Sequence, residues 1–197
     1  MSMAASSILR GAGALAVGLA AGYQLLGSDA KDSPALRPPG AADEDKFSAL
    51  CLRCGKCGLA CPYDVISFDG SGIDATPHIV AREGACRLCQ DFPCIAACPS
   101  GALSPVADRG SVRMGTAVID RDLCVSLRGI RCEVCYRCCP FIDDAIRIKY
   151  SLREGDSHHA IFEPVVDKDK CVGCGLCEQR CIISDPAVAI RIRPRDS

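Results

Sequence analysis

Large aromatic side chains are scarce in this sequence of 197 residues, which has no Trp, four Tyr and five Phe. A folded chain of this size usually builds its core around aromatic rings and branched aliphatic side chains. We therefore expect something other than side-chain packing to fill part of the interior.

An excess of charge of one sign is also missing. The 23 Lys and Arg residues nearly balance the 24 Asp and Glu residues, which gives a formal net charge of −1. Nucleic-acid-binding domains generally carry a basic patch and a basic total. We therefore expect no nucleic acid partner.

The sequence has few groups suited to catalysis. Its only histidines are His78, His158 and His159, and neither a nucleophile–base motif nor a phosphate-binding loop accompanies them. General acid–base or nucleophilic catalysis needs such groups in defined patterns. The chain is therefore predicted not to be an enzyme by itself.

Cysteine, in contrast, is abundant: there are 17, all between Cys51 and Cys181, in four loops that open at Cys51, Cys86, Cys124 and Cys171. A secreted disulfide framework is an unsuitable explanation, because the count is odd and such frameworks belong to much shorter chains. Short strand-like runs flank the loops, which predicts an α+β repeat of strand, cysteine loop, short helix and strand. The expected strands are 65–68, 78–82, 102–106, 117–120, 145–150, 164–167 and 188–192.

The first and fourth loops share the spacing Cys-x2-Cys-x2-Cys-x3-Cys. This spacing is typical of bacterial ferredoxins, in which three neighbouring thiolates hold one iron–sulfur cluster and the fourth reaches a different cluster. A zinc-binding interaction module is the competing interpretation, because zinc knuckles also use Cys-x2-Cys steps. Zinc sites pair two such steps, however, so three nearly contiguous cysteines favour [4Fe-4S] clusters.

The second and third loops are variants of this pattern. In the third, seven residues separate Cys124 from Cys132, and the loop ends in Cys135, Cys138 and Cys139. Either Cys138 completes a triplet with Cys132 and Cys135, or Cys135-x3-Cys139-Pro repeats the ending of other loops. We favour the second interpretation, which makes Cys138 a spare thiol because every loop then supplies four ligands.

Four loops of four ligands predict four [4Fe-4S] clusters. The predicted ligands are Cys51, Cys54, Cys57, Cys61, Cys86, Cys89, Cys94, Cys98, Cys124, Cys132, Cys135, Cys139, Cys171, Cys174, Cys177 and Cys181.

The region from Phe47 to Arg193 resembles the ferredoxin-type subunit of periplasmic quinol dehydrogenase modules, the NapG/MauM type. The motifs that carry the resemblance are Cys51-Leu-Arg-Cys-Gly-Lys-Cys57, Val80-Ala-Arg-Glu-Gly-Ala-Cys86, Cys94-Ile-Ala-Ala-Cys-Pro-Ser-Gly-Ala-Leu103, Gly129-Ile-Arg-Cys-Glu-Val-Cys-Tyr-Arg-Cys-Cys-Pro140 and Cys171-Val-Gly-Cys-Gly-Leu-Cys177. The sequence departs from the pattern of the other loops at Ile182, where they have Pro.

The resemblance implies an electron-transfer subunit of a quinol dehydrogenase complex. Its partners would be a polytopic quinol-oxidising membrane protein, as the donor, and a c-type cytochrome or a periplasmic reductase or dehydrogenase as the acceptor. The alternative is a cytoplasmic polyferredoxin that serves as the electron-input subunit of a larger oxidoreductase.

The resemblance to other four-cluster electron-transfer subunits also favours two ferredoxin-like units, one inserted in the other. Nested pairing assigns the ligands as Cys51, Cys54, Cys57 and Cys181; Cys61, Cys171, Cys174 and Cys177; Cys86, Cys89, Cys94 and Cys139; and Cys98, Cys124, Cys132 and Cys135. The outer unit would comprise residues 47–84 and 151–193, and the inserted unit residues 85–150. Sequential pairing of the loops is the alternative.

The N-terminal part is predicted to be a targeting or anchoring segment over residues 1–27, followed by a Pro-rich linker over residues 28–46. Its apolar run, Gly11–Leu26, has Gln24 as the only polar side chain. Export of a folded cluster protein needs a twin-arginine signal, yet Arg10 stands alone. Either the protein stays in the cell, or the true start codon lies upstream of Met1. We favour the second, which predicts a periplasmic protein associated with the inner membrane through this segment.

Overall fold

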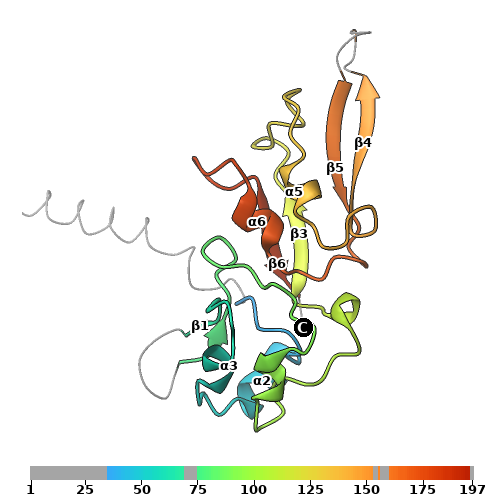
Figure 1. Cartoon of the computed structure of the whole chain (residues 1–197). Helices are drawn as coiled ribbons and strands as arrows, with labels where there is room; N and C mark the ends of the chain where they lie inside the picture. The colour runs from blue at the N-terminus through green and yellow to red at the C-terminus, as the bar shows by residue number, and fades with distance from the viewer. Residues whose placement is uncertain (1–34, 69–74, 153–154, 156–159, 196–197) are drawn as a thin grey trace, which may run out of the picture. The chain divides into compact units, whose positions relative to one another are not determined.

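Short helices and strands separated by cysteine loops make up the described part of the chain. The computed structural model describes residues 35–68, 75–152, 155 and 160–195 (Figure 1). The predicted targeting segment, residues 28–34 of the predicted linker, and His158 and His159 lie outside these ranges. Within them, no helix has the length and apolar composition needed to cross a membrane.

The helices are no longer than seven residues. They are α2 (Glu44–Leu50), α3 (Lys56–Leu59), α4 (Pro93–Ala96), α5 (Val134–Arg137) and α6 (Leu176–Arg180), with a 3-10 turn η2 (Arg109–Ser111). Each of α3 to α6 lies within one of the four cysteine loops, as the sequence predicted. Helices this short are not stable alone, so their conformation depends on the packing of the loops around them.

The strands form three antiparallel pairs, which confirms a mixed helix and strand fold. β1 (Ser67–Phe68) pairs with β2 (Pro77–His78), β3 (Gly115–Ile119) with β6 (Ile190–Pro194), and β4 (Ile146–Leu152) with β5 (Ala160–Val166). Six of the expected strands overlap these elements. The seventh, 102–106, is reduced to a single bridge between Leu103 and Ala41.

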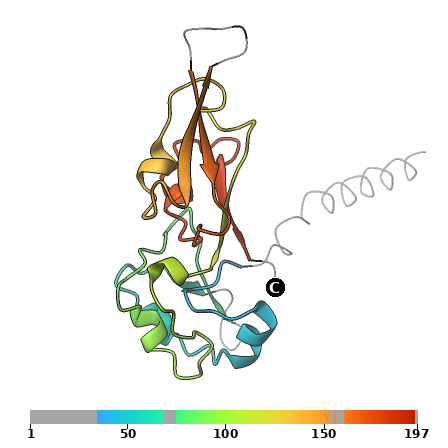
Figure 2. The same cartoon turned by 90° about the vertical axis from the view of Figure 1, so that its right-hand side faces the viewer.

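These pairs divide the described chain into two consecutive units of the same plan. In each unit an inner pair joins consecutive cysteine loops (β1–β2 or β4–β5), and an outer pair joins the unit's two ends. The outer pair is the Ala41–Leu103 bridge in the first unit, which ends near Val106, and β3–β6 in the second, which begins near Gly115. Figure 1 shows α2, α3 and β1 in one half and α5, α6 and β3 to β6 in the other, and the turned view in Figure 2 shows the same two halves.

The predicted insertion of residues 85–150 into an outer unit is therefore wrong. The physical reason is chain connectivity: Phe68 and Pro77 lie close along the chain, as do Leu152 and Ala160, so each antiparallel pair joins neighbouring loops at a small cost in loop closure. The nested plan would have joined the first loop to the fourth instead.

The predicted linker also needs correction, because residues 35–46 belong to the first unit. Pro38 and Pro39 are among the most deeply buried side chains, and Leu36 is 7% exposed. The backbone is tied into the fold where Ile79 N donates to Leu36 O at 2.8 Å. Proline rings are apolar and their backbone needs no donor partner, so a Pro-rich segment can serve as a covering layer.

Glycines allow close approaches both within the second unit and between the two units. Within the second unit, a Cβ on Gly173 would lie 2.3 Å from the backbone N of Gly115; between the units, a Cβ on Gly175 would lie 2.7 Å from Ala81 Cβ. Met114 N donates to Val172 O at 3.1 Å beside the first of these contacts. The buried residues of both units accordingly form one continuous hydrophobic cluster.

Gly173→Ala tests this close approach. Gly173 and Gly101 both have a left-handed φ, +73° and +72°, but a Cβ on Gly101 meets nothing within 4 Å. Gly101→Ala should therefore lower the free energy of unfolding by the conformational cost alone, about 1–2 kcal/mol. Gly173→Ala should lower it by about 1–3 kcal/mol more, because of overpacking. Anaerobic thermal unfolding of both variants measures the difference, and equal losses would contradict the close packing at Gly173.

Candidate metal-cluster sites

The cysteines gather around four cavities, to each of which we assign four of the predicted ligands; Cys135, assigned to the third cavity, also borders the fourth. We name the cavities site A (Cys51, Cys54, Cys57, Cys98), site B (Cys61, Cys86, Cys89, Cys94), site C (Cys124, Cys132, Cys135, Cys181) and site D (Cys139, Cys171, Cys174, Cys177). Three cysteines of each set come from one loop, and the fourth comes from the neighbouring loop of the same unit.

This grouping corrects the nested pairing of the loops. Cys181 lines site C with Cys124, and the fourth cysteine beside Cys51 is Cys98. Likewise Cys61 lies with the second loop and Cys139 with the fourth. The arrangement is the sequential alternative, and it follows from the strand pairs that place consecutive loops side by side.

The four cavities are alike in size and lining. They enclose about 330 Å³ at site A, 350 Å³ at site B and 390 Å³ at each of sites C and D. Apart from the thiols, most of the lining residues are aliphatic, aromatic or proline side chains. Similar volume and chemistry at all four indicate that they accommodate the same kind of group.

The loop backbone turns sharply so that consecutive thiols face one cavity. The second residue between the first two cysteines has positive φ at Arg53 (52°), Leu88 (51°) and Gly173 (73°). Such angles are uncommon for non-glycine residues and are found where the surrounding structure imposes them. Gly55 and Gly175, also left-handed, then begin α3 and α6.

Within each unit, a pair of short helices connects the two sites. α3 carries Cys57 of site A and is followed by Cys61 of site B, whereas α4 carries Cys94 of site B and is followed by Cys98 of site A. α3 packs against α4, as α5 packs against α6 in the second unit. Cys135, on α5, borders both sites C and D.

A buried serine fixes the long gap of the third loop. Ser126 is 1% exposed, and its Oγ is within hydrogen-bond distance of two carbonyl oxygens, that of Cys132 at 3.1 Å and that of Phe162 in β5. This contact ties Cys132 of site C to the β4–β5 pair. This role could not be predicted from the sequence, because a single Ser in a loop has no distinctive spacing.

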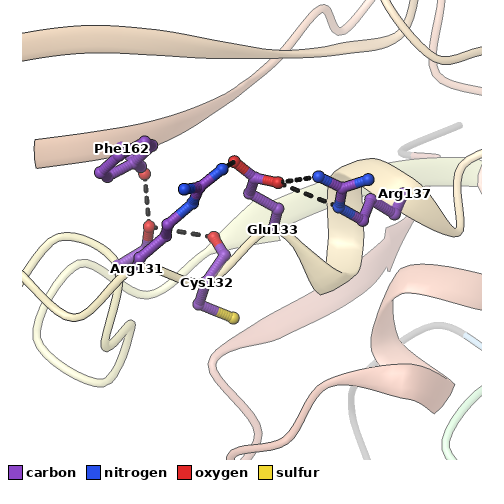
Figure 3. Close-up of polar contacts among 6 residues, drawn as sticks. Arg131, Cys132, Glu133, Arg137 and Phe162 are labelled. Carbon is purple, nitrogen blue, oxygen red and sulfur yellow. Dashed lines mark hydrogen bonds and ion pairs between the residues drawn. The ribbon is translucent and has the colours of Figure 1, made fainter.

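Two arginines hold the residue next to Cys132 (Figure 3). Glu133 accepts from Arg137 Nε at 2.9 Å and from Arg131 Nη2 at 3.2 Å. The bond from Arg137 is the main reason that the pKa of Glu133 is lowered. Arg131 also lies over the Phe162 ring, with its guanidinium carbon 5.1 Å from the ring centroid, which is within the reach of about 6 Å for a cation–π contact.

Cys138 lines none of the four cavities described here, in keeping with its predicted role as a spare thiol. Its Sγ donates to Cys135 O at 3.4 Å, and burial raises its pKa. Cys139, the next residue, lines site D instead. The contact with Cys135 O provides a structural partner for the Cys138 thiol.

Burial raises the pKa of eight of the sixteen cavity thiols and so favours their protonated form in the absence of metal. It raises the pKa to about 12 at Cys86 and Cys135, and to about 11 at Cys57, Cys94 and Cys174. Neighbouring thiols raise several of these values further. Iron binds the thiolate, so the entry of a positively charged group must displace these protons.

Backbone amides are placed to stabilise sulfur ligands. Leu88 N lies 3.5 Å from Cys86 Sγ, Leu103 N lies 3.5 Å from Cys98 Sγ, and Ala117 N lies 3.4 Å from Cys171 Sγ. Hydrogen bonds to cluster sulfurs are one of the main ways in which proteins set reduction potentials.

The donor geometry fits a cluster better than a single ion. In the described ranges, no three or more Cys, His, Asp or Glu side chains converge closely enough to hold one metal ion. Tetrahedral zinc requires four sulfurs at about 2.3 Å from one point. Thiols spread around a cavity suit the separate iron atoms of a [4Fe-4S] cubane.

Comparison with known protein families agrees with this geometry. The family model of the 4Fe-4S dicluster domain matches residues 50–102 and 128–183. The first match contains all eight cysteines of sites A and B. The second begins after Cys124 and contains the remaining ligands of sites C and D, so the two matches follow the consecutive units.

Several ferredoxin-type proteins are similar to this chain. The ferredoxin-type protein NapG of Escherichia coli is 44% identical over 189 residues, covering 93% of this chain and 81% of that protein. The methylamine utilization ferredoxin-type protein MauM of Methylophilus methylotrophus is 42% identical, covering 85% of this chain and 74% of that protein. The ferredoxin-type protein NapF of Escherichia coli is 28% identical, with coverage of 81% and 88%.

Thiol ionisation can be tested by alkylation in the cluster-free chain. Burial raises the pKa of Cys98, but hydrogen bonds from Leu103 and Ser100 outweigh it and lower the pKa below its usual value. The pKa of Cys86 is about 12. Because iodoacetamide attacks the thiolate, the rate at Cys98 should level off at a lower pH than that of an ordinary thiol, while the rate at Cys86 still rises at pH 11.

Peptide mass spectrometry after timed alkylation measures both profiles. Near pH 8, the difference in thiolate fraction alone should make alkylation of Cys98 at least about tenfold faster than alkylation of Cys86, since each pKa unit changes the thiolate fraction tenfold. Coincident profiles for the two thiols would contradict the burial of Cys86 described above.

Proposed function

This chain belongs to the 4Fe-4S ferredoxin-type proteins that include NapG and MauM, and on that premise we propose that it relays single electrons through four [4Fe-4S] clusters. In this proposal the donor is a quinol-oxidising membrane protein and the acceptors are periplasmic redox proteins. The observation that carries it is the set of four similar cavities, each lined by at least four cysteines.

The proposed ligands are the cysteines that line sites A to D. When bound, each [4Fe-4S] cluster supplies one-electron redox chemistry. The protein orients the thiolates, donates amide hydrogen bonds to sulfur, and excludes water by the apolar lining. Among the described residues nothing resembles a catalytic triad or a second reaction centre, so the proposed role is transfer and not catalysis.

The contacts between sites support a path in the order A, B, D, C. Sites A and B share α3 and α4, and sites C and D share Cys135. Between the units, Cys86 N of site B donates to Cys174 O of site D at 2.9 Å. Sites A and C are thus the two ends of the proposed path.

Both ends offer surfaces on which redox partners could dock. Cys54 of site A is the one exposed cysteine of the 17, all of which are described, and Leu52 beside it is 66% exposed. Near site C, Ile130 is 62% and Ile182 is 60% exposed. Exposed apolar side chains next to a buried redox group are the usual composition of a contact patch.

Membership of the family supports the proposal of external redox partners. A quinol gives two electrons, and several one-electron centres can hold both while a one-electron acceptor takes them in turn. A c-type cytochrome or a periplasmic reductase or dehydrogenase is the proposed acceptor. The apolar run Gly11–Leu26 supports association with the inner membrane from the periplasmic side.

Quinol-driven reduction of the anaerobically purified holoprotein tests the relay. Washed membranes of the source cell and a short-chain quinol should bleach the cluster absorbance, and an oxidised c-type cytochrome should restore it. The same fractions should carry the protein in the periplasm or on the membrane. Copurification from the cytosol with a catalytic subunit would contradict the periplasmic relay and favour an electron-input subunit.

Serine variants of two adjacent cysteines test the ligand assignment. Cys138→Ser should retain the iron and sulfide content of the natural chain, because Cys138 lines no described cavity. Cys139→Ser removes a thiol from site D and should lose about a quarter of the iron, or the electron paramagnetic resonance signal of one cluster. The opposite pattern would make Cys138 the ligand.

A further inference from the structure

One guanidinium group from the first unit contacts the end of a helix in the second. Arg82 Nη1 donates to the carbonyl oxygens of Glu178 at 2.8 Å, Gln179 at 3.2 Å and Cys181 at 2.9 Å. These carbonyls belong to the C-terminal end of α6 and the residue that follows it. Carbonyl oxygens at the C-terminal end of a helix carry partial negative charge, so a cation is favourable there, although Glu178 O also accepts from Cys181 N at 3.3 Å.

Further contacts join the same two segments. Gln179 Nε2 donates to Glu83 O at 3.2 Å, and Cys86 N donates to Cys174 O at 2.9 Å. Ala81 lies against Gly175, where any side chain on the glycine would collide with it. Residues 81–86 therefore pack along residues 174–181, and we call this contact the junction.

The junction lies between ligands of different units. Cys86 is in site B, Cys174 and Cys177 are in site D, and Cys181 at the end of α6 is in site C. Cys86 and Cys174 are both buried, so no solvent layer separates them. Of the described contacts between sites, the junction is the one that connects the two units.

We propose that Arg82 is a positioning residue that holds sites B and D at the spacing needed for electron transfer between the two units. The inference rests on the proposed relay function. The cysteines of sites B and D would hold two [4Fe-4S] clusters, and with both sites loaded one electron would pass from the reduced site to the oxidised site. No bond is formed or broken, and no proton is transferred.

The role of Arg82 is separable from cluster assembly. Arg82 donates to carbonyl oxygens and to no Sγ atom. α6 is also held within its own unit, because Ile192 N in β6 donates to Glu178 Oε2 at 2.6 Å. Loss of Arg82 should therefore loosen the junction, while each unit keeps its own pair of sites.

The test compares reduced holoprotein of the natural chain with Arg82→Gln, Arg82→Lys and a matched control, Arg121→Gln. Arg121 is a surface arginine with an ion pair to Glu163 at 2.7 Å and a side chain that is 72% exposed. Lys places one ammonium group where Nη1 lies and can donate up to three bonds. Arg82→Lys should therefore preserve part of the function that Arg82→Gln removes.

The readout is the magnetic interaction between reduced clusters in electron paramagnetic resonance, with iron content and spin count measured on the same samples. Arg82→Gln should keep the natural iron content and spin count but show narrower lines and a several-fold lower half-saturation power. Arg82→Lys should be intermediate and Arg121→Gln unchanged. Hydrogen exchange at the Cys86 amide should accelerate in Arg82→Gln alone.

Each outcome decides the proposal. Arg82→Gln with full iron, unchanged lines and unchanged saturation would overturn it, as would an equal change in Arg121→Gln. If Arg82→Gln loses iron through misfolding, the electron paramagnetic resonance spectra of Arg82→Lys and Gln179→Ala test the proposal instead. Unchanged spectra in both variants would overturn the proposal. Absence of iron from the natural chain would instead refute the relay function itself.

Discussion

Burial of cysteine thiols around four cavities is the constraint on which the rest of this structure depends. Helices of four to seven residues and strand pairs as short as two residues cannot be stable alone, and here each helix is placed by the loop that carries it. The cavity linings are apolar and the buried thiols hold their protons, with a pKa of about 12 at Cys86. A cluster that displaces those protons and fills the cavity thus contributes to folding directly.

Much of the candidate site could be predicted from the sequence, because ligand spacing is a local property. The two-residue gaps in the loop at Cys51 predict three ligands, and the same spacing predicts the short helices. The choice of Cys139 over Cys138 rested on repetition of the ending Cys-x3-Cys-Pro, and Cys139 is the residue that lines a cavity. Aromatic rings are scarce, and the four cavities occupy the part of the interior that the sequence predicted would not be filled by side chains.

Loop pairing could not be predicted from ligand spacing, because each fourth cysteine finds its site through tertiary structure. A local signal did exist: Asp69-Gly70-Ser71-Gly72 lies between two strand-like runs and is typical of a turn that would join consecutive loops. The Pro-rich segment was assigned to a linker by composition, yet Pro38 and Pro39 are buried. The contact of Arg82 with α6, 96 to 99 residues away along the chain, has no sequence signature at all.

We propose that two consecutive dicluster units hold four clusters in the order A, B, D, C. Anomalous scattering at the iron edge, from crystals of the anaerobically purified protein, would locate the iron. Four compact iron groups are expected, with Cys98 completing site A and Cys181 completing site C. Iron density that joins Cys181 to the loop at Cys51, or single metal ions in place of clusters, would contradict this proposal.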